Sequence, residues 1–204
     1  MSLLIRQDGI AEYFPAFIPA GEAQACFKTL RAGLDWRREW LCVRGRQVAA
    51  PRLVCWYGDA GAVYCYSGVR HEPLPWVPQL WTLKTRLETA VGFSFNSVLG
   101  NLYRNGQDAM GWHADKEREL GREPVIASLS FGAPRLFKLR HNKSKETVDM
   151  VLGDGDLLIM RDRLQQCWRH CLPKTRRPVG ERINLTFRLI TPLATVGEAR
   201  QRNS

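Results

Sequence analysis

The sequence lacks the features of secreted, membrane-spanning and disulfide-stapled proteins. Residues 1–10 are too short and too interrupted by charge for a secretion signal, and no apolar run approaches the roughly 20 residues of a membrane helix. The six cysteines are scattered, and no Cys-x-x-Cys pair occurs, so reduced thiols are expected. We therefore expect a cytoplasmic protein, or a nuclear one if the source is eukaryotic, and not a secreted one.

Acidic residues are also scarce relative to basic ones. The chain has 30 lysines and arginines against 20 acidic residues, which gives a net charge of +10. This balance favours a polyanionic partner, and nucleic acid is the first candidate. An ordinary basic surface is the alternative on charge alone, because net charge reports on association and not on fold.

Internal repeats and low-complexity tracts are absent as well, and 204 residues with 45% apolar composition suit one globular unit. We expect a single domain over residues 1–193. Within it, residues 1–91 would hold the helices and the strands that recognise the nucleotide, and residues 92–191 would form the core. Residues 194–204 are polar and uncapped, so a flexible tail is expected there.

Two helices and then many strands are predicted from the spacing of apolar residues. Apolar residues recur at helical spacing in 20–33 and in 76–91, and Pro73, Pro75 and Pro78 stand where the second helix would begin. After Gly92 the period changes to two, and turn sequences separate short segments. The expected strands are 95–103, 124–131, 135–141, 146–152, 156–160, 166–172 and 182–191. The pattern predicts an α+β fold, mostly β, with a sandwich or jelly roll buttressed by the N-terminal helices.

A histidine and a carboxylate two residues apart suggest a metal site. His113 and Asp115 would point the same way in an extended segment, and His170 follows on a later predicted strand. Two histidines and one carboxylate form the three-residue ligand set of non-haem iron(II) oxygenases. A structural histidine remains the alternative when His-x-Asp is considered alone.

The last predicted strand strengthens the metal interpretation. In 182–191 apolar residues alternate with polar ones, and Arg182, Asn184, Thr186 and Arg188 share the polar face. Guanidinium groups bind carboxylates in a bidentate way, so a dicarboxylate would satisfy both arginines. The alternative is a solvated polar face. A second pair with spacing two, Asn101 and Tyr103, offers an amide and a phenol that can also bind carboxylate oxygens.

The chain resembles the AlkB family of dealkylating dioxygenases over roughly residues 50 to 191. The segments that carry the resemblance are Asn96-Ser-Val-Leu-Gly-Asn-Leu-Tyr, Gly111-Trp-His-Ala-Asp, Ala127-Ser-Leu-Ser-Phe-Gly and Arg182-Ile-Asn-Leu-Thr-Phe-Arg. The closing Arg-x-Asn-x-Thr-x-Arg strand after His-x-Asp is highly specific. Upstream, Pro51-Arg-Leu-Val-Cys-Trp-Tyr-Gly and Tyr64-Cys-Tyr66 resemble members of the family that prefer single strands.

The resemblance implies a double-stranded β-helix that repairs N-alkylated bases of DNA, or of RNA, by oxidative dealkylation. Iron(II), 2-oxoglutarate and O2 would take part, with 2-oxoglutarate decarboxylated as the alkyl group is hydroxylated and lost as an aldehyde. The implied iron ligands are His113, Asp115 and His170, and the implied 2-oxoglutarate residues are Asn101, Tyr103, Arg182, Asn184, Thr186 and Arg188. The damaged base would meet Arg52, Tyr64, Tyr66 and Glu117.

Segment 41–47 leads us to expect a preference for single-stranded nucleic acid. Duplex-acting relatives place a bulky apolar wedge in this region, whereas here the matching position is Arg44. A charged side chain is a poor wedge and suits phosphate contact.

Three alternatives stay open from the sequence. One is a hydroxylase of the same superfamily that acts on protein or a small molecule, and another is a non-catalytic basic module that binds nucleic acid. The third is a zinc site at Cys167, His170 and Cys171, which lacks a recognisable fourth ligand.

Overall fold

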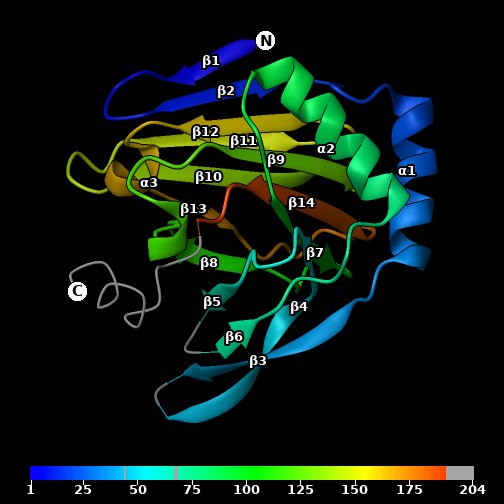
Figure 1. Cartoon of the computed structure of the whole chain (residues 1–204). Helices are drawn as coiled ribbons and strands as arrows, with labels where there is room; N and C mark the ends of the chain where they lie inside the picture. The colour runs from blue at the N-terminus through cyan, green and yellow to red at the C-terminus, as the bar shows by residue number, and fades with distance from the viewer. Residues whose placement is uncertain (44, 67–68, 192–204) are drawn as a thin grey trace, which may run out of the picture.

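The computed structural model describes residues 1–43, 45–66 and 69–191, with the backbone alone at 41–43, 64–66 and 69–71. It contains an eight-stranded and a four-stranded antiparallel sheet (Figure 1). The order of the large sheet is β1 (Ser2–Ile5), β2 (Ile10–Phe14), β12 (Leu157–Arg161), β9 (Ile126–Gly132), β14 (Arg182–Arg188), β7 (Ser97–Tyr103), β4 (Arg46–Gly58) and β3 (Arg37–Val43). The order of the small sheet is β11 (Thr147–Leu152), β10 (Arg135–His141), β13 (Trp168–Leu172) and β8 (Met110–His113). Strands β5 (Tyr64–Tyr66) and β6 (Val69–His71) form a separate pair.

Alternation along the strands of the large sheet gives it two apolar faces. One face, with Leu129 and Phe187, shares a hydrophobic cluster with helices α1 (Ala20–Gly33) and α2 (Pro78–Val91), which lie against it in Figure 1. The other face forms a second cluster with β10 and β13 of the small sheet. The candidate active-site residues lie between the two sheets, because alternate side chains of β14 and β7 point into that space.

The fold is mostly β with few helices, which agrees with the jelly roll expected of a 2-oxoglutarate oxygenase. The two helices occupy the predicted segments. Helix α2 begins at Pro78, two residues later than the apolar pattern suggests, because proline fits the first turn and lacks only an N–H that has no partner there. It ends at Val91 and is capped by Gly92, whose φ of 71° is the left-handed conformation that glycine adopts without strain.

The seven predicted strands correspond to β7, β9, β10, β11, β12, β13 and β14, and most of their ends differ from the predicted ones by one to three residues. Two of these differences have a structural reason. The last strand was predicted to reach residue 191 but ends at Arg188, and Leu189 is half exposed instead of buried. The segment 166–172 was predicted as one strand, but its first two residues belong to the short helix α3 (Leu164–Cys167). A one-turn helix leaves no periodic pattern that separates it from the strand that follows.

Strands that recognise the nucleotide were expected within residues 1–91, but no bounds were predicted for any of β1 to β6, nor for β8. Strand β4 contains Pro51, which lacks an N–H and marks edge strands or irregular pairing. The pairing of β3 with β4 shifts register there, from Arg38 opposite Leu53 to Trp40 opposite Ala49. Beyond this shift the two strands extend from the sheet as a two-stranded ribbon, which we call the β3–β4 ribbon (Figure 1).

Among the residues that the structure describes, no helix combines the length and the apolar character that a membrane span needs. The four cysteines whose side chains are described, Cys26, Cys55, Cys167 and Cys171, are free thiols. The predicted tail, 194–204, lies outside the described residues.

Candidate active site

A cavity of about 610 Å³ opens between the two sheets, with the base of the β3–β4 ribbon at its rim. Its lining combines the predicted metal ligands with the polar face of β14. The predicted residues in the lining are Arg52, Asn101, Tyr103, His113, Asp115, Glu117, His170, Arg182, Asn184, Thr186 and Arg188. The structure therefore brings together residues that are up to 136 positions apart in the sequence (188 − 52).

The three predicted metal ligands converge at one end of this cavity. Strand pairing places His170 of β13 opposite His113 of β8. Asp115 lies in the loop just after β8, and its Oδ1 is 3.5 Å from His113 Nε2 and 3.9 Å from His170 Nε2. The backbone carbonyl of Gly111 lies 2.8 Å from His113 Nδ1, which can donate to it. In that tautomer the Nε2 lone pair of His113 faces Asp115 and is free to bind a metal.

Asp115 is buried and held from two sides. The side chain of Gln165, on α3, accepts a hydrogen bond from its backbone N–H at 3.0 Å, and Arg188 Nη2 donates to its Oδ2 at 2.6 Å. Burial would raise the pKa of Asp115, but Arg188 and the two histidines outweigh it and hold that pKa well below the usual range. Asp115 is thus an anionic carboxylate, the form that binds metals.

His170 is almost fully buried, and its ring stacks on Phe137 with centroids 5.4 Å apart. Burial, together with the neighbouring His113, lowers the pKa of His170 to about 3. The imidazole is therefore neutral at physiological pH, as a metal ligand must be.

At the other end of the cavity, Arg182 is a buried guanidinium without an acidic partner among the described residues. Its side chain is 1% exposed, and its Nη2 donates to Ser130 Oγ and Asn184 Oδ1, both at 2.9 Å. Its Nε is buried without a hydrogen-bond partner, and the ring of Tyr103 lies 5.5 Å from its Cζ. Burial lowers the pKa of Arg182 to about 10, so the group stays charged. An uncompensated buried charge of this kind calls for an anionic ligand.

Neutral hydrogen-bonding groups line the wall between the arginine and the metal ligands. Asn184 accepts from Ser128 Oγ at 3.0 Å and donates to Thr186 Oγ1 at 2.8 Å. Asn101 lies opposite Asn184 in the β7–β14 pairing, and its Oδ1 accepts from Arg52 Nε at 2.7 Å. The polar face of β14 is thus buried, and the alternative that this face is exposed to solvent is wrong.

The donor set fits both groups that the sequence suggests. Two histidines and one carboxylate, with their ligand atoms within 4.8 Å of one another, suit a divalent iron and leave other coordination positions open. Arg182 at the far end of the same cavity, with its unpaired buried Nε, suits the distal carboxylate of a dicarboxylate. The residues would therefore hold iron(II) and 2-oxoglutarate together.

The structure describes only some of the residues that were predicted to contact the damaged base. Arg52 is buried and donates to Glu39 Oε2 at 3.1 Å, besides its bond to Asn101. Glu117 is half-buried and lines the cavity. Tyr64 and Tyr66 belong to β5, and their side chains, like the whole of Arg44, lie outside the described residues.

Sequence reasoning missed three residues of the site. Gln165 positions Asp115, Glu39 holds Arg52, and Trp40 lies at the cavity with 54% of its surface exposed. No spacing pattern identified them, because each acts across elements that are distant in the sequence.

The sequence is similar to those of known oxygenases. The sequence matches the 2OG-Fe(II) oxygenase superfamily over residues 11–188. It is 40% identical to the rat alpha-ketoglutarate-dependent dioxygenase alkB homolog 3, over 88% of this chain and 63% of that protein. It is 37% identical to the mouse DNA oxidative demethylase ALKBH2, over 92% of this chain and 83% of that protein. The chain thus spans slightly less than two thirds of the alkB homolog 3 relative.

A solved structure, that of OsALKBH1, shares the fold with a TM-score of 0.66, over 92% of this chain and all of that one, at 16% identity. The chain belongs to the AlkB family of the 2OG-Fe(II) oxygenase superfamily.

Proposed function

We propose that the protein is an iron(II)- and 2-oxoglutarate-dependent dioxygenase that removes alkyl groups from the bases of DNA, or of RNA. The observation that carries this proposal is that one cavity joins the His113–Asp115–His170 cluster to the buried Arg182, which has no acidic partner among the described residues. The alkB homolog 3 and ALKBH2 relatives, whose names describe a dioxygenase and a DNA demethylase, support it.

In this proposal the bound iron, with 2-oxoglutarate and O2, supplies the oxidising chemistry that hydroxylates the alkyl carbon. The protein positions the reacting groups. His113, Asp115 and His170 fix the metal, and Gln165 and Arg188 fix Asp115. The remaining predicted 2-oxoglutarate residues, with Arg182 at the distal end, would orient the co-substrate.

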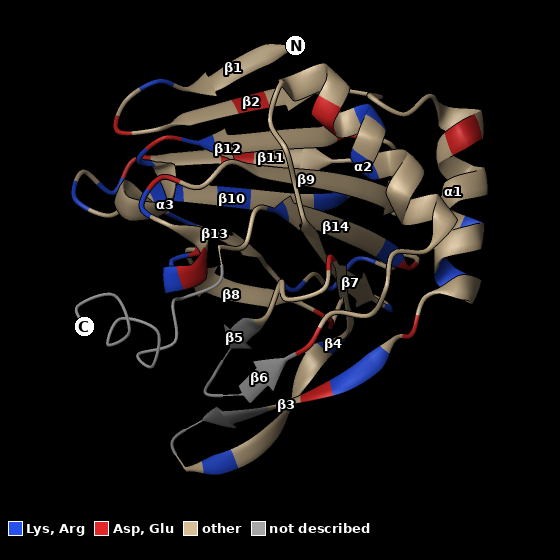
Figure 2. Cartoon of the chain, viewed as in Figure 1, with Lys and Arg blue, Asp and Glu red and all other residues tan. Residues whose placement is uncertain are grey.

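The nucleic acid would reach the site over the β3–β4 ribbon. Figure 2 shows basic positions beside an acidic one where β3 leaves the sheet, and a basic position on β4 within the ribbon. Trp40 is exposed at the rim, and aromatic rings stack on unpaired bases with about 1–3 kcal/mol per base. An alkylated Watson–Crick edge is accessible only in an unpaired or flipped base, so a stacking surface beside the cavity suits this substrate.

The domain organisation belongs to the same proposal. Residues 1–193 would act as one domain, in which the N-terminal helices buttress a double-stranded β-helix. The hydrophobic cluster that α1 and α2 share with β9 and β14 supports this arrangement.

The proposal is tested with a single-stranded oligonucleotide that carries one N-methylated base. Incubation with the protein, Fe(II), 2-oxoglutarate and O2 should lower the oligonucleotide mass by one methylene group, with formaldehyde released. The matched control is His113→Ala, which should leave the mass unchanged. Consumption of 2-oxoglutarate without any change in methylated DNA or RNA would instead support the alternative, a hydroxylase of protein or a small molecule.

Arg188→Lys is expected to weaken the apparent affinity for 2-oxoglutarate about tenfold, because lysine keeps the charge but loses the planar fork that binds carboxylates. The measurement is the 2-oxoglutarate dependence of turnover. Arg161→Lys is the matched control, since Arg161 pairs with Glu12 on the same sheet but outside the cavity. Equal affinities in the two variants would place Arg188 outside the co-substrate site.

Preference for single strands follows from Arg44 and its neighbour Arg46, which suit phosphate contact better than insertion into a base stack. Extruding a paired base costs a few kcal/mol, which an unpaired base avoids. We therefore expect faster repair of a methylated oligonucleotide alone than of the same strand annealed to its complement, at fixed salt. If the duplex is repaired as fast or faster, the preference is refuted, and Trp40 becomes the candidate wedge.

A further inference from the structure

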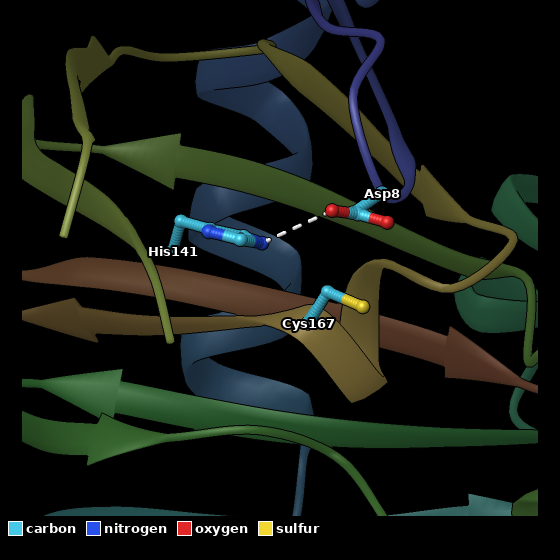
Figure 3. Close-up of side chains that lie close together, drawn as sticks. All are labelled: Asp8, His141 and Cys167. Carbon is cyan, nitrogen blue, oxygen red and sulfur yellow. Dashed lines mark ion pairs between the residues drawn. The ribbon is translucent and has the colours of Figure 1, made fainter. Parts of the chain in front are cut away.

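Three side chains from distant parts of the chain meet away from the iron ligands, where the β1–β2 turn packs on α3. They are Asp8 in the turn, His141 at the end of β10 and Cys167 at the end of α3 (Figure 3). One carboxylate oxygen, one ring nitrogen and the sulfur lie within 4.8 Å of one another. Oxygen, nitrogen and sulfur donors in one cluster are the set that zinc binds in proteins.

The spacing of these atoms is close to that of a tetrahedral zinc site. Bonds of about 2.0–2.3 Å place neighbouring ligand atoms roughly 3.3–3.8 Å apart. Asp8 Oδ2 and His141 Nε2 are already 3.4 Å apart. The sulfur of Cys167 lies within 4.8 Å of the other two atoms and has to approach them by up to about 1.5 Å, which rotation of a half-buried side chain can provide.

His141 is oriented as a ligand. Its side chain is buried, its ring packs against Trp168 with centroids 5.1 Å apart, and its Nδ1 lies 2.9 Å from Ser144 Oγ. The backbone N–H of Ser144 donates to the same Nδ1 at 3.1 Å, so in the metal-free protein Nε2 carries the ring proton and faces Asp8. Metal binding would require the other tautomer, in which Nδ1–H donates to the Ser144 hydroxyl and the Nε2 lone pair binds the ion. Metal-binding histidines commonly have such a partner on the other ring nitrogen.

Asp8 lies in the left-handed backbone region at the turn of the hairpin. Its φ is 56°, and the following Gly9 has a φ of 143°. A Cβ on Gly9 would lie 2.5 Å from the Cα of Leu164, so this turn is fitted directly against α3. Aspartate tolerates this conformation, and the close contact of Gly9 with α3 fixes the turn and so positions the Asp8 carboxylate beside His141.

We propose that Asp8, His141 and Cys167 form a second metal site that takes Zn²⁺ or a divalent ion of similar softness, with water as the fourth ligand. Binding displaces the proton of the Cys167 thiol to solvent, and the thiolate coordinates the ion. Asp8 and Cys167 are half-buried, which gives the ion a path of entry. The zinc site considered from the sequence, Cys167 with His170 and Cys171, is thereby replaced, because His170 lies with the iron ligands.

The metal would clip the N-terminal hairpin to the short helix that supports the active site. Helix α3 carries both Cys167 and Gln165, and Gln165 accepts the hydrogen bond from the backbone of Asp115. Arg163 lies 3.4 Å from Asp8 Oδ1, so in the metal-free protein Asp8 forms ion pairs that metal binding would partly replace.

Cobalt(II) provides the test, because a thiolate bound to cobalt gives a charge-transfer absorption in the near ultraviolet. The His113–Asp115–His170 cluster has no sulfur and cannot give this band. We expect the reduced, metal-free protein to develop the band on titration with Co²⁺ and to lose it on addition of Zn²⁺. Cys167→Ser should abolish the band and lower the bound zinc by one ion per chain, whereas Cys171→Ser, the matched control outside the cluster, should retain both.

A second variant covers the case in which Cys167→Ser fails to fold. Asp8→Asn keeps the shape of the turn, since asparagine tolerates positive φ, and it should weaken zinc binding at this site at least tenfold. Absence of the thiolate band in the wild type, its persistence in Cys167→Ser, or an unchanged zinc affinity in Asp8→Asn would overturn the proposal. The cluster would then be an ion pair that fastens the hairpin.

Discussion

Replacing His113 with alanine is expected to abolish iron-dependent turnover while the thermal midpoint of the protein stays close to that of the wild type. Loss of groups that only support metal ligands costs about 10- to 100-fold in affinity or activity, so loss of a direct ligand should exceed about 100-fold. The side chain of His113 is 29% exposed and packs beside the cavity, so its removal leaves no closed void. Turnover of 2-oxoglutarate and a thermal melt, measured on the same sample, test both parts.

Asp115→Ala, unlike His113→Ala, is expected to lower the stability of the protein as well as its activity. The sequence alone predicts that alanine at any of the three ligands removes activity and spares the fold. The structure adds that Asp115 pairs with the buried Arg188, so its removal should also lower the free energy of unfolding by about 3–5 kcal/mol. Near-normal turnover in either variant would refute the assignment of the iron ligands.

Replacing Arg182 with methionine is expected to separate co-substrate binding from stability. Truncating one partner of a buried charge pair costs about 2–5 kcal/mol. At about 1.4 kcal/mol per tenfold, binding of 2-oxoglutarate should weaken by roughly 30-fold to several thousandfold. Without the co-substrate, the same change removes a buried charge that has no acidic partner among the described residues, so the apoprotein should unfold at the same or a higher temperature. Calorimetric titration and thermal melts of the metal-loaded and free protein measure the two effects.

Arg135→Met is the matched control for this experiment. Arg135 is equally buried, but it donates to the backbone carbonyls of Asn105, Asp108 and Pro173 and is not part of the cavity lining. Its loss should destabilise the protein and leave the affinity for 2-oxoglutarate unchanged. If Arg182→Met instead lowered stability and bound 2-oxoglutarate normally, Arg182 would be a structural residue.

Much of the candidate site could be predicted because it depends on local spacing. Residues two apart on a strand share a face, so the pair His113 and Asp115, the pair Asn101 and Tyr103 and the polar face of β14 are visible in the sequence. Asp115 lies two residues beyond the end of β8, and its Oδ1 is still only 3.5 Å from His113 Nε2.

The rest depends on contacts that local patterns do not record. The position of Gln165 against Asp115 arises from a one-turn helix, whose last two residues were predicted as strand. The β3–β4 ribbon was missed because Pro51 interrupts the pairing. Asp8, His141 and Cys167 meet only when the N-terminal hairpin packs on α3, so their proximity has no counterpart in the spacing of the sequence.

The central claim is that this one cavity holds iron(II) and 2-oxoglutarate together, and an anaerobic absorption titration tests it most directly. Chelation of Fe(II) by a 2-oxo acid produces a visible charge-transfer band that neither component gives alone. We expect the wild type to develop this band at one equivalent of each, Arg182→Met to require far more 2-oxoglutarate, and His113→Ala to give no band. A band of equal strength and affinity in all three proteins, or no band in the wild type, would contradict it.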